Sequence, residues 1–185
     1  MREKRRKLTA VERYKAGASI CHILSRKSCF LSAKSIAVYF SQDGEIPLDM
    51  LVSRIWQSAK RCYLPILTGC GKPQMRFAPY LERSKLVENR FNIPEPVVPR
   101  KKRVNSQNLD LVLVPLVGFD SNGNRLGMGG GYYDRSFAFL RRRKVWKKPF
   151  LLGIAYDFQE LKKINKDSWD IPLSGIVTPS RFIKI

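Results

Sequence analysis

The segment LDLVLVPLVGF, residues 109–119, constrains the fold of this chain more than any other stretch. Its apolar residues follow one another without the alternation of a half-exposed strand, and the run is far too short to cross a bilayer as a helix. A continuous apolar run of this length is typical of a strand covered on both faces, as in α/β proteins. We therefore expect a buried strand here.

A strand, a helix and a second strand are predicted in succession earlier in the chain. IAVYFS at 36–41 and YLPIL at 63–67 are both apolar and rich in β-branched or aromatic residues. Between them, apolar residues recur at the spacing of one helix face, after Pro47. That face consists of Leu48, Leu51, Val52, Ile55, Trp56 and Ala59. This order of elements favours a parallel sheet.

Other elements are predicted from shorter signals. TAVE at 9–12 matches a capping box, so a helix is expected from there to about Ser25. The prolines of NIPEP, 92–96, exclude a helix from the middle of the long connection 88–108. Further strands are expected at 74–80 on an edge of the sheet, at 149–158 and at 175–183.

The composition fits one globular domain, residues 1–185, with a sizeable core, since 44% of the residues are hydrophobic. No apolar run is long enough to span a membrane, and the N-terminus lacks the apolar segment of a secretory signal. We therefore expect a cytoplasmic protein. The chain has one histidine, His22, and no C-x-x-C pair, which argues against a zinc site. Free thiols are expected at Cys21, Cys29, Cys62 and Cys70.

The charge is strongly positive, with 35 Lys and Arg residues against 15 Asp and Glu residues, or a formal +20. RKKR at 100–103 and RRRK at 141–144 could contact phosphates of a nucleic acid. Basic runs on exposed loops are, however, often only solvated surface, and no RNA-binding or helix-turn-helix motif is present. Nucleic-acid binding therefore remains an alternative function and is not the favoured one.

Five of the chain's 12 glycines fall in GNRLGMGGGYYDR, residues 123–135. Because a buried strand precedes this segment and a helix is expected to begin near Tyr132, its N–H groups should meet the helix N-terminus where α/β proteins bind ligands. The spacing matches neither a Walker A nor a Rossmann motif. Taken alone, the glycines are equally consistent with a structural turn or a close backbone approach.

Two charged neighbours favour a phosphate site. Arg125 supplies a guanidinium that suits a phosphate, and Asp134 supplies a carboxylate that could hold a divalent cation. Asp134 could instead be a first-turn carboxylate favoured by the helix dipole. A sugar-phosphate isomerase or an acyl transferase would also use an anion site of this kind, but it would not need the metal ligand.

The segment VLVPLVGFDSNGNRLGMGGGYYDR resembles the signature of the 5-formyltetrahydrofolate cyclo-ligase family, also called methenyltetrahydrofolate synthetases. IAVYFSQDGEIPLDML, MRF, NIPEP and WDIPLSGIVTP resemble other segments of that family, so the resemblance covers nearly the whole chain. It implies a three-layer α/β/α fold with a mostly parallel sheet in a single domain. It also implies that ATP and Mg²⁺ drive the conversion of 5-formyltetrahydrofolate to 5,10-methenyltetrahydrofolate, with release of ADP and phosphate.

The resemblance also assigns roles to particular residues, with Arg125 and Tyr133 as the catalytic pair. The ATP-binding residues would be Arg125, Leu126, Gly127, Met128, Gly129, Gly130, Gly131, Tyr132 and Tyr133. Mg²⁺ would be bound by Asp134 and Asp170, and the folate would contact Phe40 and Glu45. Met75, Phe91 and Tyr133 are expected as walls of the same folate pocket. Without the family, Asp170 and Glu45 could be turn carboxylates, and the apolar residues could belong to the core.

The expected partner is therefore a small folate, with or without additional glutamates, and neither a nucleic acid nor a membrane. ATP and a polyglutamylated folate are polyanions, which gives the positive charge a second explanation. The protein is expected to be a monomer.

The start of the chain departs from the family pattern. Family members usually carry a lysine, followed four residues later by an arginine, that reach the nucleotide from well before the position of Thr9. Arg2 and Arg6 have this spacing but lie further along the helix, so the role is not transferred to them. A dense basic run without a cap predicts part of a longer helix. The alternative is that nucleotide binding relies on the glycine segment and other basic residues.

Overall fold

The computed structural model describes residues 1–68, 74–143 and 148–185. Cys70, predicted to be a free thiol, and Lys144, in a predicted basic patch, lie outside these residues. Cys21, Cys29 and Cys62 are free cysteines, as predicted. In the described part of the chain, no helix combines the length and the apolar character needed to cross a membrane.

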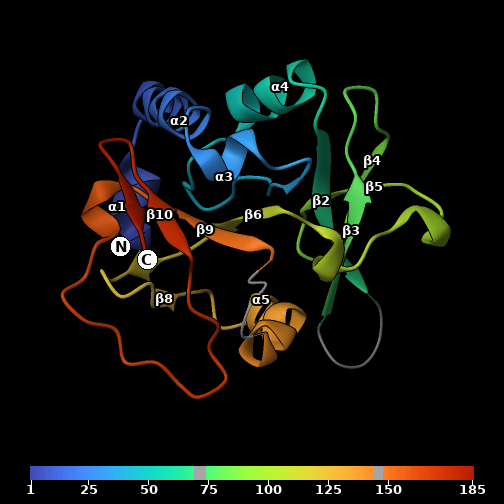
Figure 1. The fold of residues 1–185 in the computed structure, drawn as a ribbon. Coiled ribbons are helices and arrows are strands. Elements are labelled where there is room, and N and C mark those ends of the chain that lie inside the picture. Colours follow the sequence, from blue (N-terminus) through green and yellow to red (C-terminus); the bar gives the residue numbers. More distant parts are fainter. Residues whose placement is uncertain (69–73, 144–147) are drawn as a thin grey trace.

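One seven-stranded sheet organises the chain, in the order β11-β10-β9-β6-β1-β2-β3 (Figure 1). These strands are β1 (Ser35–Ala37), β2 (Arg61–Thr68), β3 (Gln74–Pro79), β6 (Leu111–Pro115), β9 (Phe150–Ile154), β10 (Gly175–Val177) and β11 (Phe182–Lys184). The strands from β10 to β2 pair in parallel, whereas β3 and β11 are antiparallel edge strands. The mostly parallel sheet and the edge strand at 74–80 are confirmed.

Helices cover both faces of the sheet (Figure 1). On one side lie α2 (Ala10–Leu24), the short α3 (Ser28–Leu31) and α4 (Asp49–Gln57). On the other side lie α5 (Tyr132–Phe137) and the 3-10 helix η3 (Ala138–Arg142). The expected three-layer α/β/α architecture is therefore confirmed.

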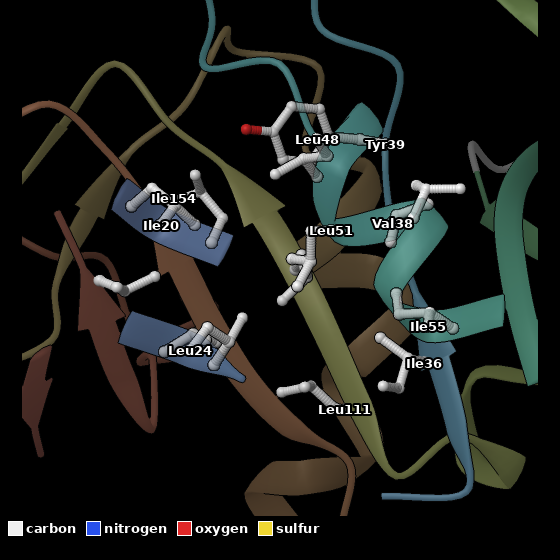
Figure 2. Close-up of a cluster of buried hydrophobic side chains, with 14 of the residues drawn as sticks. Ile20, Leu24, Ile36, Val38, Tyr39, Leu48, Leu51, Ile55, Leu111 and Ile154 are labelled. Carbon is white, nitrogen blue, oxygen red and sulfur yellow. The ribbon is translucent and has the colours of Figure 1, made fainter. Parts of the chain in front are cut away.

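The strand β6 is buried on both faces, because its alternate side chains enter two separate cores. Leu111 and Leu113 pack in the core beneath α2 and α4, whereas Val112 and Val114 pack in the core beneath α5. Figure 2 shows the first core. Each of these side chains is at most 1% exposed, and burying one such side chain contributes roughly 1.5–3 kcal/mol. The prediction of a buried strand at 109–119 is confirmed for its first half.

The helix α2 begins with the predicted capping box. The Thr9 hydroxyl accepts a hydrogen bond from the Glu12 N–H, and the Glu12 carboxylate accepts one from the Thr9 N–H. These two bonds satisfy donors that would otherwise lack partners at the start of the helix. Before it, α1 (Arg2–Lys7) forms a separate short helix without a side-chain cap.

Three more predicted strands differ in the structure. The strand predicted at 149–158 ends at Ile154. The strand predicted at 36–41 ends at Ala37, and the chain then turns so that the buried Tyr39 hydroxyl donates to the Ile46 carbonyl at 3.1 Å. The single strand predicted at 175–183 is a hairpin of β10 and β11. The Thr178 N–H donates to the Arg181 carbonyl and closes the turn.

The long connection contains short elements of its own. The hairpin of β4 (Leu86–Glu88) and β5 (Pro94–Pro96) confirms that NIPEP is not helical. The 3-10 helices η1 (Arg100–Lys102) and η2 (Ser106–Asn108) follow it. After β6, β7 (Gly118–Phe119) and β8 (Arg125–Leu126) form a small hairpin that leads into the glycine segment. A further 3-10 helix, η4 (Asp157–Gln159), follows β9.

Candidate functional site

The glycine segment, residues 127–131, joins the hairpin β7-β8 to α5, which begins at Tyr132 as predicted. Gly129 and Gly131 have φ values of +82° and +59°, which glycine adopts without steric cost. Gly127 has no positive φ, and no described atom lies within 4 Å of the place where its Cβ would be. A structural turn therefore explains Gly129 and Gly131 but gives no reason for a glycine at position 127.

The segment is open to solvent on the side that carries these glycines. Residues 126–130 are exposed, including the side chains of Leu126 and Met128. Backbone N–H groups that are exposed beside a helix N-terminus can bind an anion. The bare backbone at Gly127 is therefore available to a ligand.

Arg125 and Asp134 form an ion pair beside this segment. The Arg125 Nη2 atom lies 2.5 Å from Asp134 Oδ1, and the two side chains are 7% and 23% exposed. The same guanidinium also donates to the Ile171 carbonyl. Because Arg125 is held at two points and almost buried, its charge is fixed at the edge of the glycine segment.

Asp170 approaches the same place from the C-terminal part of the chain. The N–H of its neighbour Ile171 donates to Asp134 Oδ1 at 3.1 Å, and Asp170 itself accepts from the Asp167 N–H. Among the residues that the structure describes, no three His, Cys, Asp or Glu side chains form a metal-binding group. Two carboxylates nevertheless suit Mg²⁺, which commonly takes its remaining ligands from water and substrate phosphates. The Ile171 N–H thus brings the segment that carries Asp170 next to the Asp134 carboxylate.

Glu45 lies at the end of a tight turn that follows β1. One oxygen of its carboxylate accepts from the Gln42 N–H at 3.1 Å, and the side chain is only 13% exposed. Burial raises the pKa of Glu45, and the Gln42 hydrogen bond and the positive charge of Arg5 partly oppose this rise. Asp43 and Gly44, just before it, have φ values of +52° and +73°. The turn thus holds a nearly buried carboxylate in one direction.

The NIPEP loop connects this turn to the start of α5. The Gln42 side chain donates to the Asn92 carbonyl at 3.0 Å, and the Phe91 ring lies edge-on to Tyr132 with centroids 6.4 Å apart. The Arg90 guanidinium lies over the Phe91 ring and donates to the Tyr132 hydroxyl at 2.8 Å. Phe91 is 49% exposed, so it is a surface aromatic residue beside the glycine segment and not part of the core.

Met75 and Tyr133 lie on the inner side of α5. The Met75 N–H donates to the Ser136 hydroxyl at 2.9 Å, and its side chain is buried. The Tyr133 ring stacks on Phe137 at 6.2 Å. Burial raises the pKa of Tyr133, and the nearby Glu45 carboxylate raises it further. The Tyr133 hydroxyl therefore stays protonated and can donate a hydrogen bond.

Phe40 is the predicted site residue that the structure places in a different environment. Its ring packs against Tyr80 at 5.6 Å on the α4 side of the sheet, and Trp56 donates its indole N–H to the Tyr80 carbonyl. A cavity of about 160 Å³ adjoins this group, lined by Val38, Tyr39, Phe40, Ser41, Leu48, Asp49, Val52, Ser53, Trp56, Leu64 and Tyr80. No contact joins Phe40 to the glycine segment in the described part of the chain.

The burial of Arg5 and its contacts were not predicted from the sequence. This arginine lies in α1, is 1% exposed, and donates to Asp43 and to the Leu116 carbonyl, both at 2.9 Å. Arg2 and Arg6 also pair with Asp43. Asp43-Gly44 is a recognisable turn signal, but a run of basic residues gives no indication that one of them is buried.

Comparison with known proteins gives one consistent result. The model of the 5-formyltetrahydrofolate cyclo-ligase family matches residues 1–179. A 5-formyltetrahydrofolate cyclo-ligase of Escherichia coli K12 is 36% identical over 181 residues, which are 98% of this chain and 97% of that protein. A 5-formyltetrahydrofolate cyclo-ligase of Haemophilus influenzae is 36% identical over 179 residues, covering 96% and 92% of the two chains.

Solved structures agree with this result. The NMR structure of Aquifex aeolicus 5,10-methenyltetrahydrofolate synthetase superposes with a TM-score of 0.81 at 32% identity, over 99% of this chain and 88% of that one. A 5,10-methenyltetrahydrofolate synthetase from Mycoplasma pneumoniae has a TM-score of 0.72 at 24% identity, covering 96% and 93%, and supports the fold alone.

Proposed function

Because the chain belongs to the 5-formyltetrahydrofolate cyclo-ligase family, it converts 5-formyltetrahydrofolate to 5,10-methenyltetrahydrofolate, and we propose that it uses ATP and Mg²⁺ at the glycine segment to do so. The family accounts for the function of the chain without a nucleic acid, so we do not propose nucleic-acid binding as its primary function. The geometry suggests how the residues divide the work between the two substrates.

The bare backbone at Gly127 is the observation that best supports the nucleotide site. Neither a positive φ nor a packing neighbour requires glycine there, but phosphate oxygens can approach a backbone more closely when no Cβ is present. Arg125 lies beside the segment with a fixed guanidinium, which suits the charge of a transferring phosphoryl group. We assign residues 125–133 to ATP on this basis.

Asp134 and Asp170 are the proposed Mg²⁺ ligands. When bound, the cation would neutralise phosphate charge during phosphoryl transfer. Asp134 is paired with Arg125 in the structure, so each of the two side chains would exchange its partner when the nucleotide binds. Arg125 would then contact phosphate, and Asp134 would contact the cation.

The folate is proposed to lie between the Glu45 turn and the exposed ring of Phe91. Glu45 offers a carboxylate oxygen to N–H donors of the pterin, and Phe91 offers a flat apolar face. Met75 and Phe40 are further proposed contacts. The Phe40 ring packs against Tyr80 on the α4 side of the sheet, whereas Met75 belongs to the core on the α5 side.

The proposed reaction requires no covalent bond to the protein. The formyl oxygen attacks the γ-phosphorus of ATP and releases ADP; N10 then attacks the formyl carbon, and phosphate leaves as the ring closes. The protein mainly positions the reactants and stabilises charge. Arg125 can balance charge on the phosphoryl oxygens, and the protonated Tyr133 hydroxyl can donate to an oxygen of the reacting groups.

We also propose that residues 1–185 form one domain that acts as a cytoplasmic monomer, and that the excess positive charge favours folates with several glutamates. Light scattering would measure the oligomeric state. A rise in affinity with glutamate number that disappears at high salt would support the role of charge.

The decisive assay mixes the protein with 5-formyltetrahydrofolate and Mg-ATP and follows the near-ultraviolet absorbance of the methenyl product. ADP and phosphate should appear in equal amounts with it. Product formation without nucleotide, or in excess chelator, would contradict the proposed use of ATP and Mg²⁺. An Arg125→Gln variant, with its folding checked by circular dichroism, tests whether the activity depends on the proposed site.

A further inference from the structure

The buried arginine of α1 is an unusual feature of this chain. The other residues of α1 are exposed, whereas Arg5 is 1% exposed. Its Nη1 atom donates to the Leu116 carbonyl, just after β6, and its Nη2 atom donates to Asp43 Oδ2. Arg5 thus connects α1 to the central strand and to the turn that carries Glu45.

The charge of Arg5 lies close to the proposed folate carboxylate. Its Nη1 atom is 3.9 Å from Glu45 Oε1, which is too long for a hydrogen bond but short enough for a strong electrostatic interaction. The second oxygen of Glu45 accepts from the Gln42 N–H. The backbone therefore fixes one side of the carboxylate, and Arg5 faces the other.

The backbone of α1 also supports the turn. A Cβ on Gly44 would lie 2.6 Å from the Arg5 carbonyl oxygen, so this glycine is packed directly against α1. The Tyr156 hydroxyl also donates to the Gly44 carbonyl, at 3.2 Å. A turn held in this way gives Glu45 little freedom to change direction.

Stability alone does not account for a charge at position 5. The Arg5 Nε atom is buried and has no hydrogen-bond partner among the described residues. A buried charge with an unsatisfied donor is costly, and well-packed apolar residues often replace such groups without loss of stability. The positive charge of Arg5 is therefore better explained by its electrostatic effect on the Glu45 carboxylate.

We propose that Arg5 is a positioning residue for the folate, which keeps the Glu45 carboxylate ionised and directed at the pterin. This inference rests on the proposed role of Glu45 in folate binding. The contacts that carry it are those of Arg5 with Glu45, Asp43 and Leu116.

Among the described residues, Arg5 is the cation whose charge acts on Glu45. The Asp43 carboxylate raises the pKa of Glu45, whereas Arg5 lowers it. Three tyrosines face Glu45 from other elements, but burial raises the pKa of each one, so they stay neutral where Glu45 titrates. These are Tyr39, Tyr133 and Tyr156, the last with a pKa of about 12. Removing the Arg5 charge should therefore raise the pKa of Glu45 further.

The test compares Arg5→Met with Arg6→Met. Arg6 is in the same helix and pairs with the same Asp43, but its side chain is 59% exposed and no contact joins it to Glu45 in the described residues. Calorimetry across pH 5–8.5 would measure the dissociation constants of 5-formyltetrahydrofolate and of ATP separately. We expect Arg5→Met to weaken folate binding about 10-fold at the acid end of this range and progressively less at higher pH, as Glu45 ionises again. ATP affinity should change less than about twofold, and Arg6→Met should resemble the wild type.

A double-mutant cycle with Glu45→Gln separates the possible failures. If Glu45→Gln leaves folate binding unchanged, the proposed folate site is wrong. The inference is overturned if Glu45→Gln weakens folate binding but the loss of folate affinity caused by Arg5→Met is the same at every pH and also the same in the Glu45→Gln background. Arg5 would then have only a structural role. If Arg5→Met does not fold, Arg5→Gln serves instead, because its amide keeps a hydrogen-bond donor but removes the charge. A shift of the acid limb to higher pH would support the inference, and an unshifted pH profile would refute it.

Discussion

Replacing Gly127 with alanine should leave the fold intact while weakening the binding of ATP. In the free protein, no described atom lies within 4 Å of the new Cβ, and φ at this position is not positive. A compatible Gly→Ala change stabilises a protein by about 0.4–1 kcal/mol through the unfolded state. We therefore expect unfolding in urea to occur at the same or a slightly higher concentration.

The loss of ATP affinity follows from the proposed contact between phosphate and backbone. Charged oxygens accept from backbone N–H groups at about 2.9 Å, and each such bond contributes roughly 1.5–3 kcal/mol. If the methyl group removes one of them, the dissociation constant of Mg-ATP should rise about 10- to 100-fold. Calorimetric titration with Mg-ATP measures this directly, and folate affinity should be unchanged.

Gly129→Ala is the matched comparison for this experiment. It changes the same segment, but φ is +82° there, so the alanine should cost about 1–2 kcal/mol of stability. The reasoning is refuted if Gly127→Ala binds Mg-ATP as tightly as the wild type, because the bare backbone would then not be part of the nucleotide site. A large loss of stability in Gly127→Ala would also contradict the open environment of this position.

Four other outcomes are expected. EDTA in excess should abolish product formation and restored Mg²⁺ should recover it, as measured by near-ultraviolet absorbance; activity that persists in chelator would exclude the metal role. Asp134→Asn should lower kcat at least about 100-fold, because the amide keeps the shape of the side chain but not its charge. The circular dichroism spectrum of this variant should remain that of the native protein. A near-normal kcat would mean that Asp134 serves only as the ion-pair partner of Arg125. Glu45→Gln should weaken 5-formyltetrahydrofolate about 10-fold but not ATP. Because burial raises the pKa of Glu45, its ionisation destabilises the folded state as pH rises. Urea unfolding should therefore show that Glu45→Gln loses less stability than the wild type as the pH rises above the ordinary pKa of a glutamate.

The sequence predicted those parts of the fold that depend on local patterns. The capping box of Thr9 and Glu12 and the continuous apolar run of β6 each have a direct physical reason, and both are confirmed. The hairpin at 175–183 was missed, because its turn interrupts an apolar run that reads as one strand.

The candidate site was predictable only where its residues are neighbours in the chain. Arg125, Gly127 and Asp134 share one segment, so their proximity could be expected. The contact of Gln42 with Asn92 and that of Arg5 with Glu45 join residues 50 and 40 positions apart. The spacing of apolar and polar residues along the sequence does not predict such pairs, because they depend on how the helices, strands and loops pack together.

The order of strands in the sheet bears on how the chain folds. The central strand β6 pairs with β1 and β9, both distant in sequence, whereas each edge strand pairs with the strand immediately before it in the chain. Closing large loops before any native contact forms is entropically expensive and slows folding. We therefore infer that assembly of β1, β6 and β9 limits the folding rate, and that β3 and β11 dock afterwards. The amides of β6 should then exchange with deuterium most slowly, and those of the edge strands should open in smaller, independent fluctuations.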